Sequence, residues 1–292
     1  MRRTRVRKII GLCIKSPNCH ARFLAFLDKA RNRGFVTAAD PTLLAARVLR
    51  IWAAVLALTV GPNAFGTHPL QTEDTGTQGA GNTELENGLA WVRQDSSWFF
   101  SYQPQLSFGI ATTADLILQP SWLVTSLAND TKTRGLGDTN LDGKWRFYGE
   151  APWSFAVRAG LALPTSQHGQ GEPHGEVGTH VLLATTYDAA PVMVHGNIAY
   201  LHNPTGGLQK ADSSRVSGAI MWACTESWTF SAEAAIFSSV DPGNNAWRAT
   251  MLVGAIYTVK PGLDLDVGYQ RTAHVAVVTN AWLAGLTYRF AP

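Results

Sequence analysis

The sequence predicts an all-β protein, a transmembrane antiparallel up-and-down β-barrel of about 12 strands, and three observations support this. From about Asn82 to Phe290 the chain consists of stretches in which apolar and polar residues alternate. Short and long connections take turns between these stretches, and aromatic residues collect near their ends. Alternation over segments of roughly ten residues is typical of strands with one face toward lipid and the other toward a lumen.

The connections indicate the topology of the expected barrel. Those after even-numbered strands have three or four residues, and Glu150-Ala-Pro-Trp153 and Val259-Lys-Pro-Gly262 carry the Pro and Gly that end strands. Those after odd-numbered strands are mostly longer and include the polar loops 165–176 and 204–213. This order places short turns in the periplasm and long loops outside. The twelve expected strands are residues 82–93, 98–110, 115–126, 137–149, 154–164, 177–187, 192–203, 214–224, 228–239, 247–258, 263–273 and 279–290.

The last expected strand shows how alternation assigns faces. Trp282, Leu286 and Tyr288 fall on one face, and Leu283 and Arg289 fall on the other. A secreted β-sandwich would also alternate, but amphipathic rings at both strand ends favour a barrel, because such rings prefer the two membrane interfaces. The expected outer girdle is Trp91, Trp98, Trp122, Trp247 and Trp282, and the inner girdle is Trp153, Tyr187, Trp228, Tyr257 and Tyr288.

Residues 1–66 differ from the rest of the chain. They hold 12 of the 24 Lys and Arg residues but only two of the 21 acids. The apolar stretch Ile51–Val60 follows, and then come Gly61-Pro62 and Ala64-Phe65-Gly66, in the order of a signal peptide with cleavage near Gly66. A stretch this short does not span a bilayer as a helix. The expected location is therefore the outer membrane of a Gram-negative-type envelope.

The expected domains are a basic leader plus signal peptide (1–66), a polar N-terminal segment (67–81) and the β-barrel (82–290). Residues 1–46 are either an extended leader or a mis-called start, and a third alternative makes residues 32–58 an amphipathic helical domain. The polar segment is either a small plug in the lumen or a disordered periplasmic leader. As a plug, its acids Glu73 and Asp74 would pair with Arg146, Arg158 or Arg289.

The densest polar pattern occupies every second residue from Asp138 to Arg146, and a period of two turns all five side chains into the lumen. Such residues either select a solute or form structural salt bridges, and a 12-stranded barrel is of intermediate size, so both alternatives stay open. The lumen-lining candidates are Asp138, Asn140, Asp142, Lys144, Arg146, Arg158, His195, Glu233, Arg248, Asp264, Asp266 and Arg289.

Several motifs resemble a known family. They are His68-Pro-Leu-Gln-Thr-Glu-Asp-Thr-Gly-Thr-Gln-Gly79, Gly135-Leu-Gly-Asp-Thr-Asn-Leu-Asp-Gly-Lys-Trp-Arg-Phe-Tyr148, Leu163-Pro-Thr165, Leu263-Asp-Leu-Asp-Val-Gly268 and Leu283-Ala-Gly-Leu-Thr-Tyr-Arg-Phe290. Together they are similar to the outer-membrane barrels of the MetA-pathway of phenol degradation family, over nearly all of residues 67–290. The resemblance implies a transporter-like channel linked to the uptake or degradation of aromatic compounds. It supplies no set of binding residues.

We therefore expect a channel for passive uptake of small solutes, aromatic or otherwise hydrophobic, and not an enzyme. The alternative is a non-conducting barrel with a structural or surface-interaction role. The pair Asp264 and Asp266 is spaced for acid-base chemistry but also suits a lumen lining, and His168 and His174 have no clear third metal ligand. We expect no cofactor, no metal and no nucleic acid. The expected partners are outer-membrane lipid, a small solute and the barrel-assembly machinery.

Overall fold

The computed structural model describes residues 68–127, 132–166, 176–204, 210–239, 245–273 and 278–290. The chain divides into two units, residues 1–50 and 51–292, and every described residue belongs to the second. The predicted leader and signal peptide, and the loop residues His168 and His174, lie outside the described residues.

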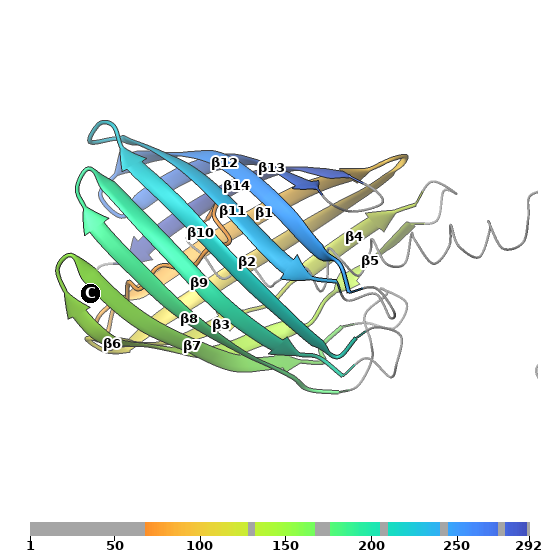
Figure 1. The fold of residues 1–292 in the computed structure, drawn as a ribbon, viewed down its shortest axis with the longest axis horizontal. Helices are drawn as coiled ribbons and strands as arrows, with labels where there is room; N and C mark the ends of the chain where they lie inside the picture. The colour runs from red at the N-terminus through yellow and green to blue at the C-terminus, as the bar shows by residue number, and fades with distance from the viewer. Residues whose placement is uncertain are drawn as a thin grey trace, which may run out of the picture. The chain divides into compact units, whose positions relative to one another are not determined.

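The described chain is an antiparallel β-barrel (Figure 1). Each strand pairs with its neighbour, and β1 pairs with both β2 and β14, which closes the sheet. The strand segments are β1 (Thr83–Gln94), β2 (Ser97–Ala111), β3 (Ala114–Gln119), β4 (Trp122–Ser126), β5 (Lys132–Leu136), β6 (Thr139–Glu150), β7 (Trp153–Leu163), β8 (Gly178–Ala189), β9 (Val192–His202), β10 (Asp212–Ala223), β11 (Trp228–Ser238), β12 (Trp247–Lys260), β13 (Leu263–Ala273) and β14 (Thr279–Phe290).

These segments make twelve strands, as predicted, because two strands are interrupted. Both β3 and β4 pair with β2 and form one strand broken at Pro120-Ser121. On their other side β6 pairs with β3 and β5 pairs with β4, so β5 and β6 form the next strand. Proline has no N–H to donate to a ladder, which explains the first break. The amide of Gly137, in the break between β5 and β6, donates to the carbonyl of Ser121, in the break between β3 and β4, at 3.0 Å. This hydrogen bond connects the two interrupted strands.

The predicted boundaries were wrong at this place. β5 lies in the expected loop 127–136, and β6 begins at Thr139, so Asp138 lies between two strand segments and not within the predicted strand 137–149. The sequence Lys-Thr-Arg-Gly-Leu of β5 has no apolar alternation, and its backbone hydrogen bonds with β4 hold it in the sheet. The first outer connection is also shorter than the later ones, since only Asp95 and Ser96 separate β1 from β2.

The two faces of the sheet have opposite polarity. Apolar side chains such as Ile198, Met251 and Val267 point outward and are 62%, 70% and 58% exposed. The inward face is polar, and its charged residues Asp142, Lys144 and Arg158 are buried. This arrangement is the reverse of a soluble protein and suits a strand wall in contact with lipid.

Aromatic pairs lie at the barrel end that carries the short turns, called the short-turn end below. Trp153 packs on Tyr187 and Trp228 packs on Tyr257, each pair with ring centroids 4.8 Å apart. Both pairs join neighbouring strands where those strands begin or end, as expected for an interfacial girdle. In the described part of the chain, no helix is both long and apolar enough to cross a membrane.

The polarity of the outer face predicts that a charge at mid-strand destabilises the barrel. Val267 lies in the middle of β13 and faces outward, so Val267→Arg should lower the free energy of unfolding from lipid vesicles by about 2–4 kcal/mol, the cost of arginine at the bilayer midplane. Denaturant titration in vesicles measures this. Val278→Arg, just before β14, is the control and should cost about 0–1 kcal/mol near the interface. Equal costs at both positions would contradict the assignment of Val267 to the lipid face.

Candidate functional site: the lumen and its inner segment

Residues 68–82, called the inner segment below, cross the barrel lumen. Their contacts reach inward-facing side chains all round the wall. His68 hydrogen-bonds Asp266 of β13, and the amide of Thr72 donates to Glu233 of β11 at 2.8 Å. Further along, the amide of Thr75 donates to Thr186 of β8, and the amide of Gln78 donates to Asp115 of β3. Of the two alternatives for the polar segment, the structure contains the one inside the lumen.

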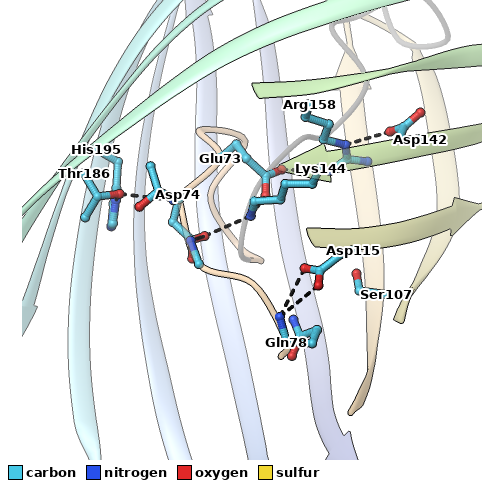
Figure 2. A network of polar contacts seen from close by, with 12 residues as sticks. Glu73, Asp74, Gln78, Ser107, Asp115, Asp142, Lys144, Arg158, Thr186 and His195 are labelled. Atoms are coloured by element: carbon cyan, nitrogen blue, oxygen red, sulfur yellow. Dashed lines mark hydrogen bonds and ion pairs between the residues drawn. The ribbon is translucent and has the colours of Figure 1, made fainter. Parts of the chain in front are cut away.

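Glu73 of the inner segment lies beside Lys144 and Arg158 of the wall (Figure 2). Its carboxylate accepts from Lys144 Nζ at 2.6 Å and from Arg158 Nη1 at 2.7 Å. Asn197 accepts from the Glu73 amide at 2.7 Å and donates to its carbonyl at 2.8 Å. Lys144 also contacts Asp74 at 3.1 Å. One residue of the segment thus binds side chains from β6, β7 and β9.

The ion pairs continue into the wall. Arg158 Nε donates to Asp142 Oδ2 at 2.7 Å, and the other oxygen of Asp142 hydrogen-bonds His180 Nε2 at 2.8 Å. The side chains of Arg158 and Asp142 are fully buried. Removing one partner of such a pair leaves a buried charge uncompensated and costs about 3–5 kcal/mol. The cluster therefore couples the position of the inner segment to the packing of β6, β7 and β8.

Asp74 extends this charge cluster toward open space, since its side chain is 34% exposed. Burial alone would raise the pKa of Asp74, but the charges of Lys144 and His195 and the hydrogen bonds from Lys144 and the Gly76 amide bring it below its ordinary value. The carboxylate is therefore ionised at neutral pH and adds a negative charge beside Glu73.

A second ion pair holds the backbone of the inner segment. Glu233 Oε2 accepts from the amides of Gln71 and Thr72 at 2.7 and 2.8 Å, and its Oε1 accepts from Arg215 Nη2 at 2.7 Å. Arg215 Nη1 in turn donates to the carbonyl of Gln71 at 2.9 Å. Buried peptide groups need hydrogen-bond partners, and here a buried ion pair supplies them.

Apolar contact and small residues complete the fit. Leu70 is 1% exposed and packs in a cluster with inward residues that include Ala219, Leu252 and Leu283. Glycines leave room for the segment. A Cβ on Gly254 would lie 2.6 Å from Pro69 Cγ, and one on Gly109 would lie 1.8 Å from the carbonyl oxygen of Gly79. No side chain larger than hydrogen fits at either place without displacing the segment.

A family described as "Putative MetA-pathway of phenol degradation" has a sequence model that matches residues 66–290. The chain belongs to this family. The resemblance inferred from the sequence motifs is thereby confirmed, and the match includes the inner segment as well as all strands of the barrel.

Solved structures show the same fold for this family member. An outer-membrane channel from Pseudomonas putida F1 has a TM-score of 0.59 at 12% identity and covers 74% of this chain and 98% of that chain. The KdgM porin has a TM-score of 0.51 at 11% identity, with coverage of 70% and 99%. No curated protein matches the chain significantly. These likenesses show the outer-membrane β-barrel fold, and the predicted fold class is confirmed.

Most predicted lumen residues of this family member lie inside its barrel. Asn140, Asp142, Lys144, Arg158, His195, Glu233 and Asp266 are buried there. Asp264 and Arg289 pair with each other at 2.6 Å at the short-turn end.

Three further predicted residues lie in a break of the sheet or toward an end of the barrel. Asp138 accepts from the amide of Ser166 in the break between β5 and β6. Arg146 lies at the short-turn end and donates to the carbonyl of Thr112 at 3.4 Å. Arg248 lies toward the opposite end, where its guanidinium donates to Ser239. Of the three arginines expected to pair with the acids of the segment, Arg158 binds Glu73, and Arg289 instead binds Glu84 and Asp264.

Sequence reasoning missed the inward glycines and the residues Glu84, Glu86, Gln105 and Asp115. All of them follow the same alternation as the predicted residues, so a full count of inward positions would have found them. Glycine at an inward position of a strand often marks a close approach of another backbone, and this signal was available at Gly109 and Gly254.

The fit at Gly254 predicts a way to displace the inner segment. Gly254→Val should force Pro69 away, because overpacking costs about 1–3 kcal/mol. With Cys13, Cys19 and Cys224 each replaced by Ser to remove the native thiols and Leu70→Cys as reporter, labelling by a water-soluble maleimide should rise about tenfold, the effect of about 1.4 kcal/mol. Gly143→Val is the matched control, since a Cβ at Gly143 meets nothing within 4 Å. Equal labelling in both variants would show that the inner segment does not need the space left by Gly254.

Proposed function

We propose that this protein is an outer-membrane channel through which small solutes pass down their concentration gradient. The observation that carries the proposal is a closed barrel whose inward face is charged and polar and whose lumen is narrowed by the inner segment. A barrel that only needs stability can fill its interior with side chains, whereas polar groups around a partly filled lumen support passage of water and solutes.

The solute class follows from the family. Its description links these barrels to phenol degradation, so small aromatic compounds are the proposed solutes. Passage requires no covalent step and no cofactor. The protein contributes a wall that keeps lipid out, and side chains that decide which solutes pass.

The proposal includes export through the predicted signal peptide, with cleavage near Gly66, and folding by the barrel-assembly machinery. His68 packs against the inward glycines Gly88 and Gly285, with ring atoms 2.8 and 2.3 Å from where their Cβ atoms would be. This close fit leaves little room beside His68 for further residues. Cleavage near Gly66 would leave only Thr67 before His68, so the mature chain would fit the lumen. We assign the short-turn end to the periplasm, because outer-membrane barrels have short periplasmic turns and longer external loops.

Recording from planar bilayers tests the channel. The native protein should give a small, steady conductance, and Glu73→Gln should raise it, because a neutral amide leaves Lys144 and Arg158 without their shared carboxylate and loosens the inner segment. Glu226→Gln, on an exposed short turn, should conduct like the native protein.

Heat-modifiable gel migration confirms folding of each variant before recording. A folded barrel that inserts into bilayers but gives no current and no solute uptake into liposomes would overturn the channel. That result would support the alternative of a non-conducting barrel with a structural or surface-interaction role.

A further inference from the structure

Two arginines lie on the outward face of the barrel at the end opposite the short turns, called the long-loop end below. Arg93 near the end of β1 and Arg271 near the end of β13 are both exposed, and both pair in register with Asn280 of β14, which lies between them. Asn280 also faces outward, two residues before Trp282, which is 64% exposed. Because neighbouring strands are about 4.8 Å apart, the backbones of the two arginines are about 10 Å apart across the wall.

The two arginines lie just beyond a row of outward aromatic rings. Trp91 of β1 pairs with Trp282 of β14, and Trp282 packs on Tyr269 of β13 with ring centroids 5.0 Å apart. Arg93 and Arg271 each follow this row by two residues, which is about 7 Å along a strand. Tryptophan and tyrosine prefer the interface of a membrane, so the arginines lie at the level of lipid headgroups and not of acyl chains.

Two more cations extend the positive charge along the wall at the same end of the barrel (Figure 1). Lys132 and Arg134 of β5 are exposed and point outward. They pair in register with Ser126 and Val124 of β4, and β4 pairs in turn with the beginning of β2. A charged residue on the lipid face is costly at the bilayer midplane and is tolerated near the interfaces. The outward face of β5 therefore suits headgroups.

The residues Arg93, Lys132, Arg134 and Arg271, called the outer basic face below, keep a net positive charge. In the described part of the chain, none of them forms an ion pair with an acid. Arg93 Nε reaches the backbone carbonyl of Asp95, in the turn after β1, at 3.5 Å. Even with the Asp95 carboxylate counted, the positive charges exceed the negative one. Arginine suits phosphate, because its planar fork of N–H donors matches two phosphate oxygens.

We propose that the outer basic face binds the phosphate groups of a glycolipid in the outer leaflet of the outer membrane. Charge and depth together identify the occupant, because an anionic group at headgroup level beside a lipid-facing wall belongs to a lipid. Arg93 and Arg271 each take one phosphate of a headgroup that is phosphorylated at both ends, and Asn280 between them faces its sugars. The inference rests on the proposed orientation, in which the long-loop end is external.

Native mass spectrometry of the folded protein, released from detergent, tests the site with diphosphorylated lipid A as the probe. Arg93→Gln and Arg271→Gln should each lower the affinity about fivefold and the double variant about 30-fold, the effect of about 1 kcal/mol for each basic residue. Lys260→Gln, an exposed cation at the end of β12 and at the short-turn end, is the matched control and should bind like the native protein. Heat-modifiable gel migration shows that each variant is folded. Unchanged affinity in the double variant, or an equal loss in the control, overturns the site.

A second measurement needs no variant. The native protein should bind diphosphorylated lipid A about fivefold more tightly than monophosphorylated lipid A, because only the first offers a phosphate to each arginine. Both should bind more tightly than phosphatidylethanolamine, whose headgroup has no net charge. Equal affinity for the three lipids overturns the phosphate site while the channel stands. A barrel that shows this order of affinities but carries no current overturns the channel and supports this inference.

Discussion

The core of a bilayer offers no water to hydrogen-bond a peptide group, so every N–H and C=O of a membrane-spanning strand needs a partner within the protein. The closed ladder, in which β1 pairs with both β2 and β14, meets this need. The interruption at Pro120-Ser121 is also bridged, since Gly137 donates to the carbonyl of Ser121 across it. Closure in turn requires strand alternation, because each strand then has one face in lipid and one in the lumen. The inward position of the charged side chains Asp142, Lys144 and Arg158 follows from this constraint.

Charges that face inward are removed from bulk water and need partners of their own. Much of that need is met by the inner segment, which is itself polar and could not stay ordered alone. Glu73 binds Lys144 and Arg158 at once, and Glu233 caps the amides of Gln71 and Thr72. Wall and segment therefore stabilise one another. The same contacts reduce the open cross-section of the lumen, so the feature that stabilises the barrel also limits what passes through it.

The remaining charge is unevenly distributed. The wall of β6, β7 and β10 supplies the cations Lys144, Arg158 and Arg215, and all three are occupied by acids of the segment or of the wall. The wall of β13, β14 and β1 carries more carboxylates than cations, and Glu86 lies outside its ion pairs.

The sequence by itself determined the twelve strands and the faces of residues such as Trp282 and Arg289, because a period of two is a local property of an extended chain. It also indicated most of the inward polar residues, including Lys144, Arg158 and Asp266. Only the tertiary structure decided that β5 continues the wall, since its hydrogen bonds come from β4 and not from its own pattern. Only the tertiary structure decided the position of the inner segment and its partners. Residues 68–82 have no periodicity to read, and Glu73 meets Arg158 85 residues away because the closed barrel brings its walls around the segment.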